Sequence, residues 1–440
     1  MTTAPAPCET LVRAGILVTQ DAARTIIEDA GLAITNGLVL AVGPWAMMHD
    51  AWAPGRTMDL TNHLVLPGLI NAHTHAAMTA FRGLADDLPL MEWLTKHIWP
   101  VENRLTPEVV HDGTLLACAE MLATGTTCFA DQYLFMPHAA QACERMGMRG
   151  VLGSGVLSFA TRAYATPAEA FRHIEEFTAN VADSALVRTA VVPHAAYSTT
   201  PDVLRESWEL AQRLDILWST HAAESPDETA LCLEKFGQRP LPYLHKLGCL
   251  GPRSLLAHVV DASDEELDIL AETGASVSHN PRSNMKLANG VAPATKFLAK
   301  GINFGLGSDG AGSNNSLNIF KEMATAALTQ KVHTNDATAM PAQAVLDAAT
   351  VNGAKAVGWD GLGTLTPGSP ADLTALDLDH PGMVPLYNPV SHIVYAASGG
   401  EVRLTMVAGR VVYEDRAFPG VDPGELAACA ARLKAWALEK

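Results

Sequence analysis

The sequence predicts a barrel of eight parallel β/α units, accompanied by a small β-sandwich that is built from both ends of the chain. Three observations support this fold class. Between about residues 67 and 361, buried strand patterns such as RTAVVPH alternate with helical patterns such as TPEVVHDGTLLACAEMLATG. Short β-rich runs flank this region on both sides. Polar residues that could do chemistry fall at the carboxyl ends of the apolar runs, where barrel enzymes carry their active sites.

The two flanks each contain four short strand patterns separated by turn residues. These patterns cover residues 16–19, 32–34, 38–42 and 63–66, and then 372–376, 392–396, 402–407 and 410–413. No linker separates the flanks from the middle, so we expect residues 1–66 and 366–440, including a C-terminal helix, to pack beside a barrel over residues 67–365. A Rossmann sheet is the competing topology, but no G-x-G-x-x-G follows the first strand of the middle region.

The composition is that of a folded protein without an affinity for polyanions. Hydrophobic residues make up 48% of the chain and charged residues 18%, which is far from the composition of disordered chains. The net charge of −17 disfavours binding to nucleic acid or to an anionic membrane surface. Seven scattered cysteines without a C-x-x-C pair, and no long apolar segment, predict reduced thiols and a cytoplasmic location.

The motif PGLINAHTH is the strongest local signal. Its two histidines, His73 and His75, stand two residues apart at a strand end, so their rings share one face and could bind one metal ion. In isolation an H-x-H pattern is more often a pair of loop histidines. The preceding Pro-Gly turn and β-branched strand, together with further ligand candidates downstream, favour the metal-binding interpretation.

Two further motifs could complete a metal site. In STHAAE, His221 ends an apolar run and Glu224 follows three residues later, where it could serve as an acid and base or simply begin the next helix. In FGLGSDG, Asp309 follows the last barrel strand, although S-D-G alone is ordinary turn chemistry. If the barrel forms, His73, His75, His221 and Asp309 converge on its axis and give zinc nitrogen and oxygen ligands with one position left open.

Two other histidines also end apolar strands. His194 stands in VVPHAAYS and His258 stands in LLAHVV. A single buried histidine is commonly structural, but both of these lie on the same predicted rim as the metal candidates, which favours roles in the site.

The ordered set PGLINAHTH, HAAE, LLAH, SHNPRSNMKLANG and GSDG resembles the amidohydrolase superfamily, and within it the methylthioadenosine/S-adenosylhomocysteine deaminases and the related triazine hydrolases. The resemblance covers nearly the whole chain. It implies one zinc ion per chain bound by His73, His75, His221 and Asp309, with Fe²⁺ or Mn²⁺ as alternatives. It also implies a small nucleoside substrate, and a homodimer is compatible with it.

The resemblance implies roles for the remaining site residues as well. Glu224 matches the proton shuttle and His258 the histidine that orients the reactive water. His194 matches a substrate-contacting histidine on the fifth strand, and Glu102, in WPVENRL, matches the carboxylate that binds the ribose hydroxyls. From the residues alone, Glu102 is equally well read as a surface helix residue.

One departure from the family pattern concerns the substrate. The arginine that similar deaminases place shortly after the fourth strand has no clear counterpart, because the aligned stretch reads VLGSGVL, with Arg149 and Arg162 on either side.

The expected reaction is the hydrolytic deamination of an adenine nucleoside. Zinc would make hydroxide available at neutral pH, Asp309 would accept the water proton, and Glu224 would protonate N1 of the purine as hydroxide adds at C6. A guanine or 8-oxoguanine deaminase and an s-triazine amino- or chlorohydrolase are alternatives with the same ligands. A non-catalytic scaffold is disfavoured because every ligand is present, and a cytidine-deaminase fold lacks its P-C-x-x-C signature here.

Overall fold

Eight parallel strands form a nearly closed barrel within residues 4–439, the part of the chain that this computed structural model describes. The strands pair in chain order from β5 to β12, which confirms the predicted architecture. Their bounds are β5 Leu69–Thr74, β6 Thr126–Tyr133, β7 Arg149–Val156, β8 Val187–Pro193, β9 Leu217–Ala222, β10 Ser254–His258, β11 Ser276–His279 and β12 Phe304–Leu306.

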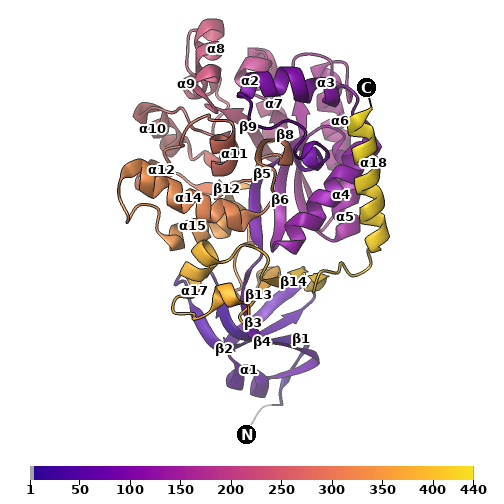
Figure 1. The fold of residues 1–440 in the computed structure, drawn as a ribbon, viewed down its shortest axis with the longest axis vertical. Coiled ribbons are helices and arrows are strands. Elements are labelled where there is room, and N and C mark those ends of the chain that lie inside the picture. The colour runs from indigo at the N-terminus through magenta and orange to yellow at the C-terminus, as the bar shows by residue number, and fades with distance from the viewer. Residues whose placement is uncertain (1–3, 440) are drawn as a thin grey trace.

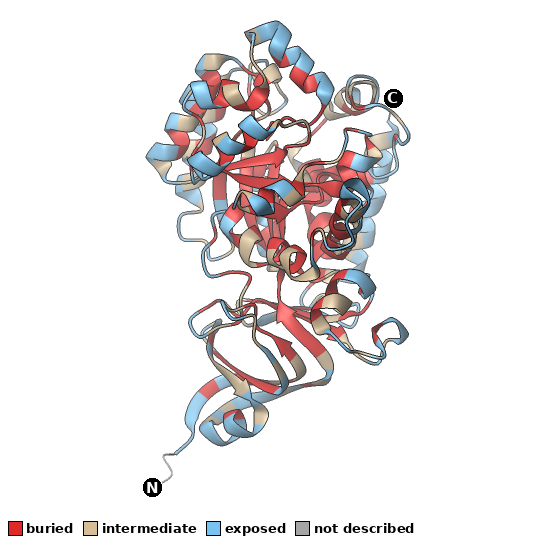
Figure 2. Ribbon diagram, turned by 90° about the vertical axis from the view of Figure 1, so that its left-hand side faces the viewer, coloured by how far each residue is buried: buried red, intermediate tan, exposed pale blue. Residues whose placement is uncertain are grey.

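Helices surround the barrel and present their apolar faces to it, so that the strands are buried and the outer helix surfaces are exposed (Figures 1 and 2). Most of these helices have proline in the first turn, where its missing N–H costs no hydrogen bond. Several are capped by a Ser or Thr side chain, which accepts from a free amide of that turn. The helices are α4 Pro107–Ala123, α5 Met136–Met146, α6 Pro167–Asn180, α7 Pro201–Leu214, α8 Pro226–Phe236, α9 Pro240–Lys246, α10 Asp264–Thr273, α11 Pro281–Lys286, α12 Ala294–Ala299, α13 Ala311–Asn314, α14 Ile319–Thr334, α15 Ala342–Ala349 and α16 Val351–Ala356.

The seam between the last strand, β12, and the first, β5, is closed by hydrogen bonds just beyond the end of β12. The amide N–H of Asp309 donates to the carbonyl of His73 over 3.0 Å. The side chain of Asn71 donates to Ser308 Oγ (2.7 Å) and accepts from the Ser308 amide (3.0 Å). Gly307 leaves room for this closure, because a Cβ at that position would lie 2.2 Å from Asn280 Oδ1.

Strands from both ends of the chain form the second domain. Over residues 4–439 it is one seven-stranded mixed sheet in the order β15-β14-β13-β4-β1-β2-β3, so the predicted sandwich is realised as a single hydrogen-bonded sheet around its own apolar core. Its strands are β1 Ala6–Val18, β2 Ile26–Thr35, β3 Leu38–Pro44, β4 Trp52–Pro67, β13 Leu373–Asp377, β14 Val402–Val407 and β15 Arg410–Glu414, and helix α1 Trp45–Ala51 packs against β2 and β3.

A single residue separates the last N-terminal strand of this sheet from the first strand of the barrel. Strand β4 ends at Pro67 and β5 begins at Leu69, so only Gly68 intervenes. A Cβ on Gly68 would lie 2.1 Å from Thr127 Oγ1, which explains why glycine occupies this position. The short junction fixes how the first barrel strand leaves the sheet.

The C-terminal helix α18 Pro423–Leu438 runs along the outside of the barrel against α4 (Figure 1). An ion pair between Arg432 and Asp112 joins the two helices at 2.6 Å. At the far end, Trp436 packs edge to face on Phe81 and donates from its indole N–H to the carbonyl of Arg104 (3.2 Å). The end of α18 therefore lies beside the segment that follows Glu102.

The prediction of a strand over residues 392–396 is wrong. His392–Ala396 forms a short π-helical turn, η5, which continues the helix α17 Pro389–Ser391. Asn388 caps this helix by accepting from the Ser391 amide (3.0 Å), and Pro389 suits its first turn. A five-residue apolar run does not distinguish a buried strand from a buried helical turn.

None of the helices within residues 4–439 combines the length and the apolar character needed to span a bilayer.

A buried ion pair holds the barrel to the terminal sheet. Arg149, at the start of β7, forms two hydrogen bonds to the carboxylate of Asp372, at 2.7 and 3.0 Å, and its guanidinium also lies over the ring of Trp359. The Asp372 carboxylate further accepts from the amide of Ala408 (2.8 Å). Both charged side chains are nearly inaccessible to water, so each depends on the other for compensation.

We expect Asp372→Ala to lower the free energy of unfolding by about 3–5 kcal/mol, because it leaves the Arg149 guanidinium buried without a counter-charge. Urea denaturation followed by tryptophan fluorescence measures the loss. The control is Glu175→Ala in helix α6, which removes the exposed pair with Arg213 and should cost about 1 kcal/mol or less. Equal losses in the two variants would contradict the role assigned to the buried pair.

Candidate metal centre and active site

Three histidines and one aspartate converge at the carboxyl ends of the barrel strands. Two of the histidines come from the first strand and one from the fifth, and the aspartate follows the eighth. His73 lies in β5, His75 directly follows it, His221 lies in β9 and Asp309 follows β12. Asp309 Oδ1 lies 3.4 Å from His73 Nε2 and 3.2 Å from His75 Nε2. The Nε2 atoms of His75 and His221 lie 3.3 Å apart. The four predicted ligands are thus brought together in one place.

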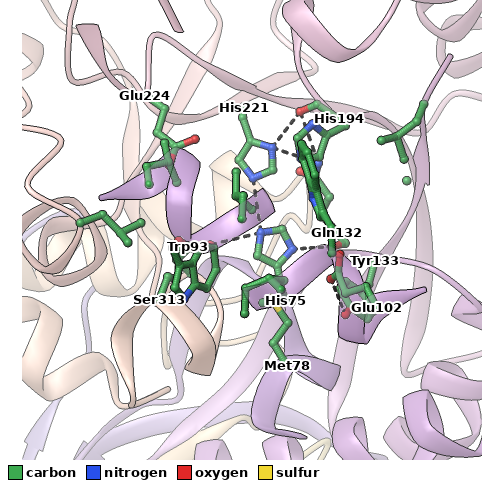
Figure 3. A pocket seen from close by; sticks show the side chains of 18 of the residues that line it. His75, Met78, Trp93, Glu102, Gln132, Tyr133, His194, His221, Glu224 and Ser313 are labelled. Atoms are coloured by element: carbon green, nitrogen blue, oxygen red, sulfur yellow. Dashed lines mark hydrogen bonds and ion pairs between the residues drawn. The ribbon is translucent and has the colours of Figure 1, made fainter. Parts of the chain in front are cut away.

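The outer nitrogens of these rings are fixed by the backbone, which turns Nε2 inward. His75 Nδ1 lies 2.6 Å from the carbonyl oxygen of Gln132, and His221 Nδ1 lies 2.7 Å from that of His194. Such hydrogen bonds select the ring tautomer that leaves Nε2 free to accept a metal ion. Figure 3 shows the His75 and His221 rings facing each other across this space.

Asp309 is held by two serine side chains. Ser283 in α11 and Ser313 in α13 both donate to Asp309 Oδ2, at 2.6 and 2.7 Å. The other carboxylate oxygen, Oδ1, faces His73 and His75. Because the serines occupy one oxygen, the carboxylate is oriented to offer the other to the cluster.

The protonation states suit a divalent cation. Burial lowers the pKa of His73 to about 4, and burial together with the neighbouring histidines lowers the pKa of His221 well below its ordinary value. At Asp309 burial is outweighed by the adjacent imidazoles of His73 and His75, which hold its pKa well below the usual range. At His75 burial is likewise outweighed by Asp309, which raises its pKa to about 9, so a metal ion would displace a proton there.

An unpaired nitrogen on His73 also supports a bound metal ion at this site. His73 Nε2 is buried and has no hydrogen-bond partner, which is costly unless another ligand satisfies it. His73, His221, His258 and Asp309 each offer one donor atom, and these atoms lie within 4.8 Å of one another. Imidazole nitrogens with one carboxylate oxygen are ligands that zinc binds in proteins.

His258 and Glu224 meet at the open side of the cluster. His258 Nε2 lies 3.9 Å from Glu224 Oε1, while His258 Nδ1 lies 2.8 Å from Asn284 Oδ1. Glu224 accepts a hydrogen bond from the side chain of Asn289 (3.2 Å) and is only 8% exposed. Burial raises the pKa of Glu224, which favours its protonated form.

Left-handed backbone conformations position three of these strand ends. His258 has φ of 79°, Asp309 has φ of 58°, and Ala223, directly before Glu224, has φ of 52°. None of these residues is glycine, so each conformation is strained and requires support from its surroundings. At Glu224 the support comes from Glu228 in α8, whose carboxylate accepts from the Glu224 amide over 2.7 Å.

The cluster forms the floor of a cavity of 130 Å³. Glu102, at the end of α3 Trp99–Glu102, lines this cavity and accepts a hydrogen bond from Tyr133 Oη (2.7 Å). His194 also lines it, with Nδ1 2.8 Å from Ser198 Oγ. Figure 3 places Glu102 and Glu224 on opposite sides of His75 and His221. Every site residue predicted from the sequence therefore lies in or beside one cavity.

The strand positions inferred from the resemblance were too high by one. His194 follows β8, the fourth strand of the barrel, and VLGSGVL belongs to β7 and the loop after it, the third. Arg149, at the amino end of β7, lies in the ion pair with Asp372 and does not line the cavity.

Supporting residues were missed by the sequence analysis. Ser283, Asn284 and Asn289 hold Asp309, His258 and Glu224. All three lie in SHNPRSNMKLANG, which the resemblance quoted without assigning roles. No local motif indicated that Gln132, Tyr133 or the largely apolar segment 90–99 would line the cavity. Their sequence predicts only strand and helix.

The chain belongs to the amidohydrolase family, whose model matches residues 64–412. A curated relative, the 5-methylthioadenosine/S-adenosylhomocysteine deaminase of Nitratidesulfovibrio vulgaris, is 52% identical over 434 residues, which is 99% of each chain. The 5'-deoxyadenosine deaminase of Methanothermobacter thermautotrophicus is 42% identical over 393 residues, covering 88% of this chain and 92% of its own. Among solved structures, a zinc-bound adenosine deaminase of Xanthomonas campestris has a TM-score of 0.96 at 38% identity, covering 98% of this chain and 99% of its own.

Proposed function

We propose that this protein deaminates adenine nucleosides, such as 5'-methylthioadenosine, S-adenosylhomocysteine or adenosine, to the inosine analogue and ammonia. One observation carries the proposal: a buried carboxylate with a raised pKa, Glu224, lies 3.9 Å from His258 at the open side of a His/Asp cluster. The deaminase names of proteins that match almost the full chain support the same reaction class.

Zinc is the proposed metal, one ion per chain, with His73, His75, His221 and Asp309 as its ligands. The zinc in a structure with a TM-score of 0.96 supports this choice, although Fe²⁺ and Mn²⁺ accept the same donors. His258 also offers a donor atom to the cluster. We assign it the role of orienting water because its Nε2 faces Glu224 while Asn284 holds its other nitrogen.

A zinc ion held by these residues would lower the pKa of water toward ~7 and would so make hydroxide available at neutral pH. Asp309 accepts the water proton, and His258 Nε2 directs the nucleophile toward C6 of the purine. Glu224 donates its proton to N1 as the C6–O bond forms. Asp309 then passes the proton that it took from water to the exocyclic nitrogen, the C6–N bond breaks and ammonia leaves, and the proton of the C6 hydroxyl returns to Glu224 as the carbonyl forms.

Glu102 is proposed to bind the ribose hydroxyls. Tyr133 occupies one of its oxygens at 2.7 Å, and the carboxylate lies within the cavity. Burial raises the pKa of Glu102, so its charged form needs hydrogen-bond donors such as vicinal hydroxyls. His194, which burial keeps neutral by lowering its pKa to about 4, is proposed to contact the nucleoside beside it.

Two further proposals concern the protein as a whole. The seven cysteines, all within the described part of the chain, are buried and unpaired, which supports a reducing cytoplasm. A homodimer remains a proposal from the family resemblance.

We expect Glu224→Gln to bind zinc normally and to lose about 10²–10⁴-fold in kcat, because the amide cannot donate the acid proton. Ammonia release from 5'-methylthioadenosine and metal analysis of the same sample measure both properties. Near-normal turnover would contradict the role of Glu224.

The same assay separates the alternatives. Guanine and an s-triazine serve as the competing substrates, with ammonia and chloride as the products. Turnover of one of these, without turnover of adenine nucleosides, would replace the proposed reaction with that alternative.

We expect Asp309→Ala to reduce bound zinc from about one ion per chain to a small fraction, and to lower the thermal midpoint, because metal binding stabilises the folded state. Metal analysis after dialysis measures the loss. His49→Ala, an exposed histidine outside the barrel, is the control. Full zinc occupancy in Asp309→Ala would exclude Asp309 as a ligand.

We expect Asn289→Ala to move the alkaline limb of the kcat profile to higher pH. Activity that needs protonated Glu224 falls as pH rises through its pKa. The hydrogen bond from Asn289 favours the charged carboxylate, so its removal raises that pKa further. Asn62→Ala, which removes an exposed hydrogen bond to Asp379, is the control. A shift toward lower pH would reverse the assignment.

A further inference from the structure

We propose that Glu228 is a positioning residue for the reaction: it does not touch the substrate, but it fixes the backbone that carries the acid Glu224. This inference rests on the proposed function, since it concerns the residue assigned there as the proton donor. Glu228 lies in the first turn of α8 and does not line the cavity of 130 Å³. Its effect on turnover must therefore pass through Glu224.

Helix α8 begins with the sequence Ser-Pro-Asp-Glu, which has the spacing of a capping box. In this motif the side chain of the first residue accepts from the amide of the fourth, and the carboxylate of the fourth accepts from the amide of the first. Ser225 follows the rule, because its Oγ accepts from the Glu228 amide over 3.2 Å. The Glu228 carboxylate instead accepts from the amide of Glu224, one residue earlier, over 2.7 Å. The bond thus reaches the proposed acid and not the helix cap.

Two other helices show what such a bond does away from the site. At α10 the capping box is complete, since Glu266 accepts from the amide of its own cap, Ser263, over 2.7 Å. At α6 the bond is displaced as it is at α8: Glu169 accepts from the amide of Ala165, one residue before the cap Thr166, over 2.7 Å. This second bond is exposed to solvent. A displaced cap is therefore compatible with an ordinary surface position.

Glu228 differs from Glu169 in its burial. It is 3% exposed, and its other oxygen, Oε1, is buried and has no hydrogen-bond partner in the described part of the chain. Burying a carboxyl group in this way is costly. Burial raises the pKa of Glu228 to about 8, so the group is mainly neutral at pH 7. A helix cap does not require this burial, as α6 shows, and we attribute it to the peptide group that Glu228 holds.

That peptide group, between Ala223 and Glu224, is fixed on both sides. Its carbonyl, on Ala223, accepts from the amides of Val260 and Asp261, at 2.8 and 2.9 Å. Its N–H, on Glu224, donates to Glu228. Ala223 has the left-handed φ of 52°, which a residue with a side chain rarely adopts, and these bonds support it. The orientation of the peptide plane therefore depends on Glu228 as much as on the loop after β10.

The orientation of this peptide determines where the acid points. The Glu224 side chain leaves the backbone directly after it, and its Oε1 lies 3.9 Å from His258 Nε2 and 3.2 Å from the side-chain nitrogen of Asn289. The amides that hold the carbonyl closely follow His258 in the chain, so the same contacts join the acid to the histidine that orients the water. Without Glu228 the carboxyl group should tilt away from N1, and a displacement of about 1 Å can cost about 10²-fold in rate.

The test measures kcat and KM of the full-length zinc-loaded protein for 5'-methylthioadenosine. Glu228→Met keeps the length of the side chain but removes the accepting oxygen. We expect it to lower kcat at least about tenfold, with KM within about threefold of the wild-type value and zinc content unchanged. Glu228→Gln keeps an uncharged oxygen that can accept from the Glu224 amide, so its kcat should exceed that of Glu228→Met at least about fivefold.

Glu169→Met is the matched control, because it removes the same displaced bond at the start of α6, and none of the described residues of α6 lines the cavity. Its kcat should stay within about twofold of the wild-type value. Near-normal kcat in Glu228→Met would overturn the inference. An equal loss in Glu228→Gln or in Glu169→Met would overturn it as well, since the loss would then not follow the hydrogen bond to Glu224.

A double-mutant cycle separates positioning from general damage to the fold. In a Glu224→Gln background the acid is already absent, so adding Glu228→Met should lower the residual turnover by less than about twofold. A further loss as large as that in the wild-type background would show that Glu228 acts elsewhere, and the inference would fail.

If circular dichroism shows that Glu228→Met does not fold, Glu228→Ala takes its place in both comparisons, with the same loss expected and with normal kcat again overturning the inference. A wild-type protein that releases no ammonia from adenine nucleosides would instead remove the proposed function. An active wild-type protein with a normal Glu228→Met variant removes only the role of Glu228, so the two failures are distinguishable.

Discussion

The closure of the barrel seam is the interaction on which the rest of the site depends. The amide of Asp309 donates to the carbonyl of His73, so the bond that joins the last strand to the first also joins two proposed metal ligands. Two hydrogen bonds between Asn71 and Ser308, one donated by each residue, reinforce this contact. The carboxylate and the imidazoles, which are distant in the sequence, are therefore positioned by backbone geometry. The same hydrogen bonds support the strained left-handed φ of Asp309.

A layer of buried side chains makes the ligands rigid. Ser283 and Ser313 hold Asp309, and both stand on short helices joined by Glu322, whose carboxylate accepts from the side chain of Asn314 and from the amide of Arg282. Burial raises the pKa of Glu322 to about 8. Orientation of ligands by such partners contributes to metal affinity as directly as the ligands themselves. The residues from the segment 90–99 that line the cavity are apolar, namely Leu90, Trp93, Leu94, Ile98 and Trp99, so this segment offers packing surface beside the polar cluster.

The architecture and the cluster could be predicted from the sequence because both leave periodic or spaced signals. The barrel follows from alternating strand and helix patterns, and His73, His75, His221 and Asp309 each end an apolar run. Ser283 and Ser313 could not be predicted from spacing, because their role depends on how two loops approach Asp309 in space. The segment 392–396 was predicted as a strand because a short, mainly apolar run is compatible with a strand or with a helical turn. The Asn388 side chain caps the start of a helix here, which favours the helical turn. Glu102 lacked a pattern of its own, since it stands on a short helix and reaches the cavity only through tertiary packing.

The course of helix α18 has a practical consequence for producing the protein. The first residues that the structure describes lead into β1 of the terminal sheet, whereas α18 lies beside α4 of the barrel (Figure 1). Near the end of α18, Trp436 contacts Arg104 and Phe81. Trp436 braces the segment that leads out of Glu102, and an affinity tag at the amino end leaves this contact unaltered.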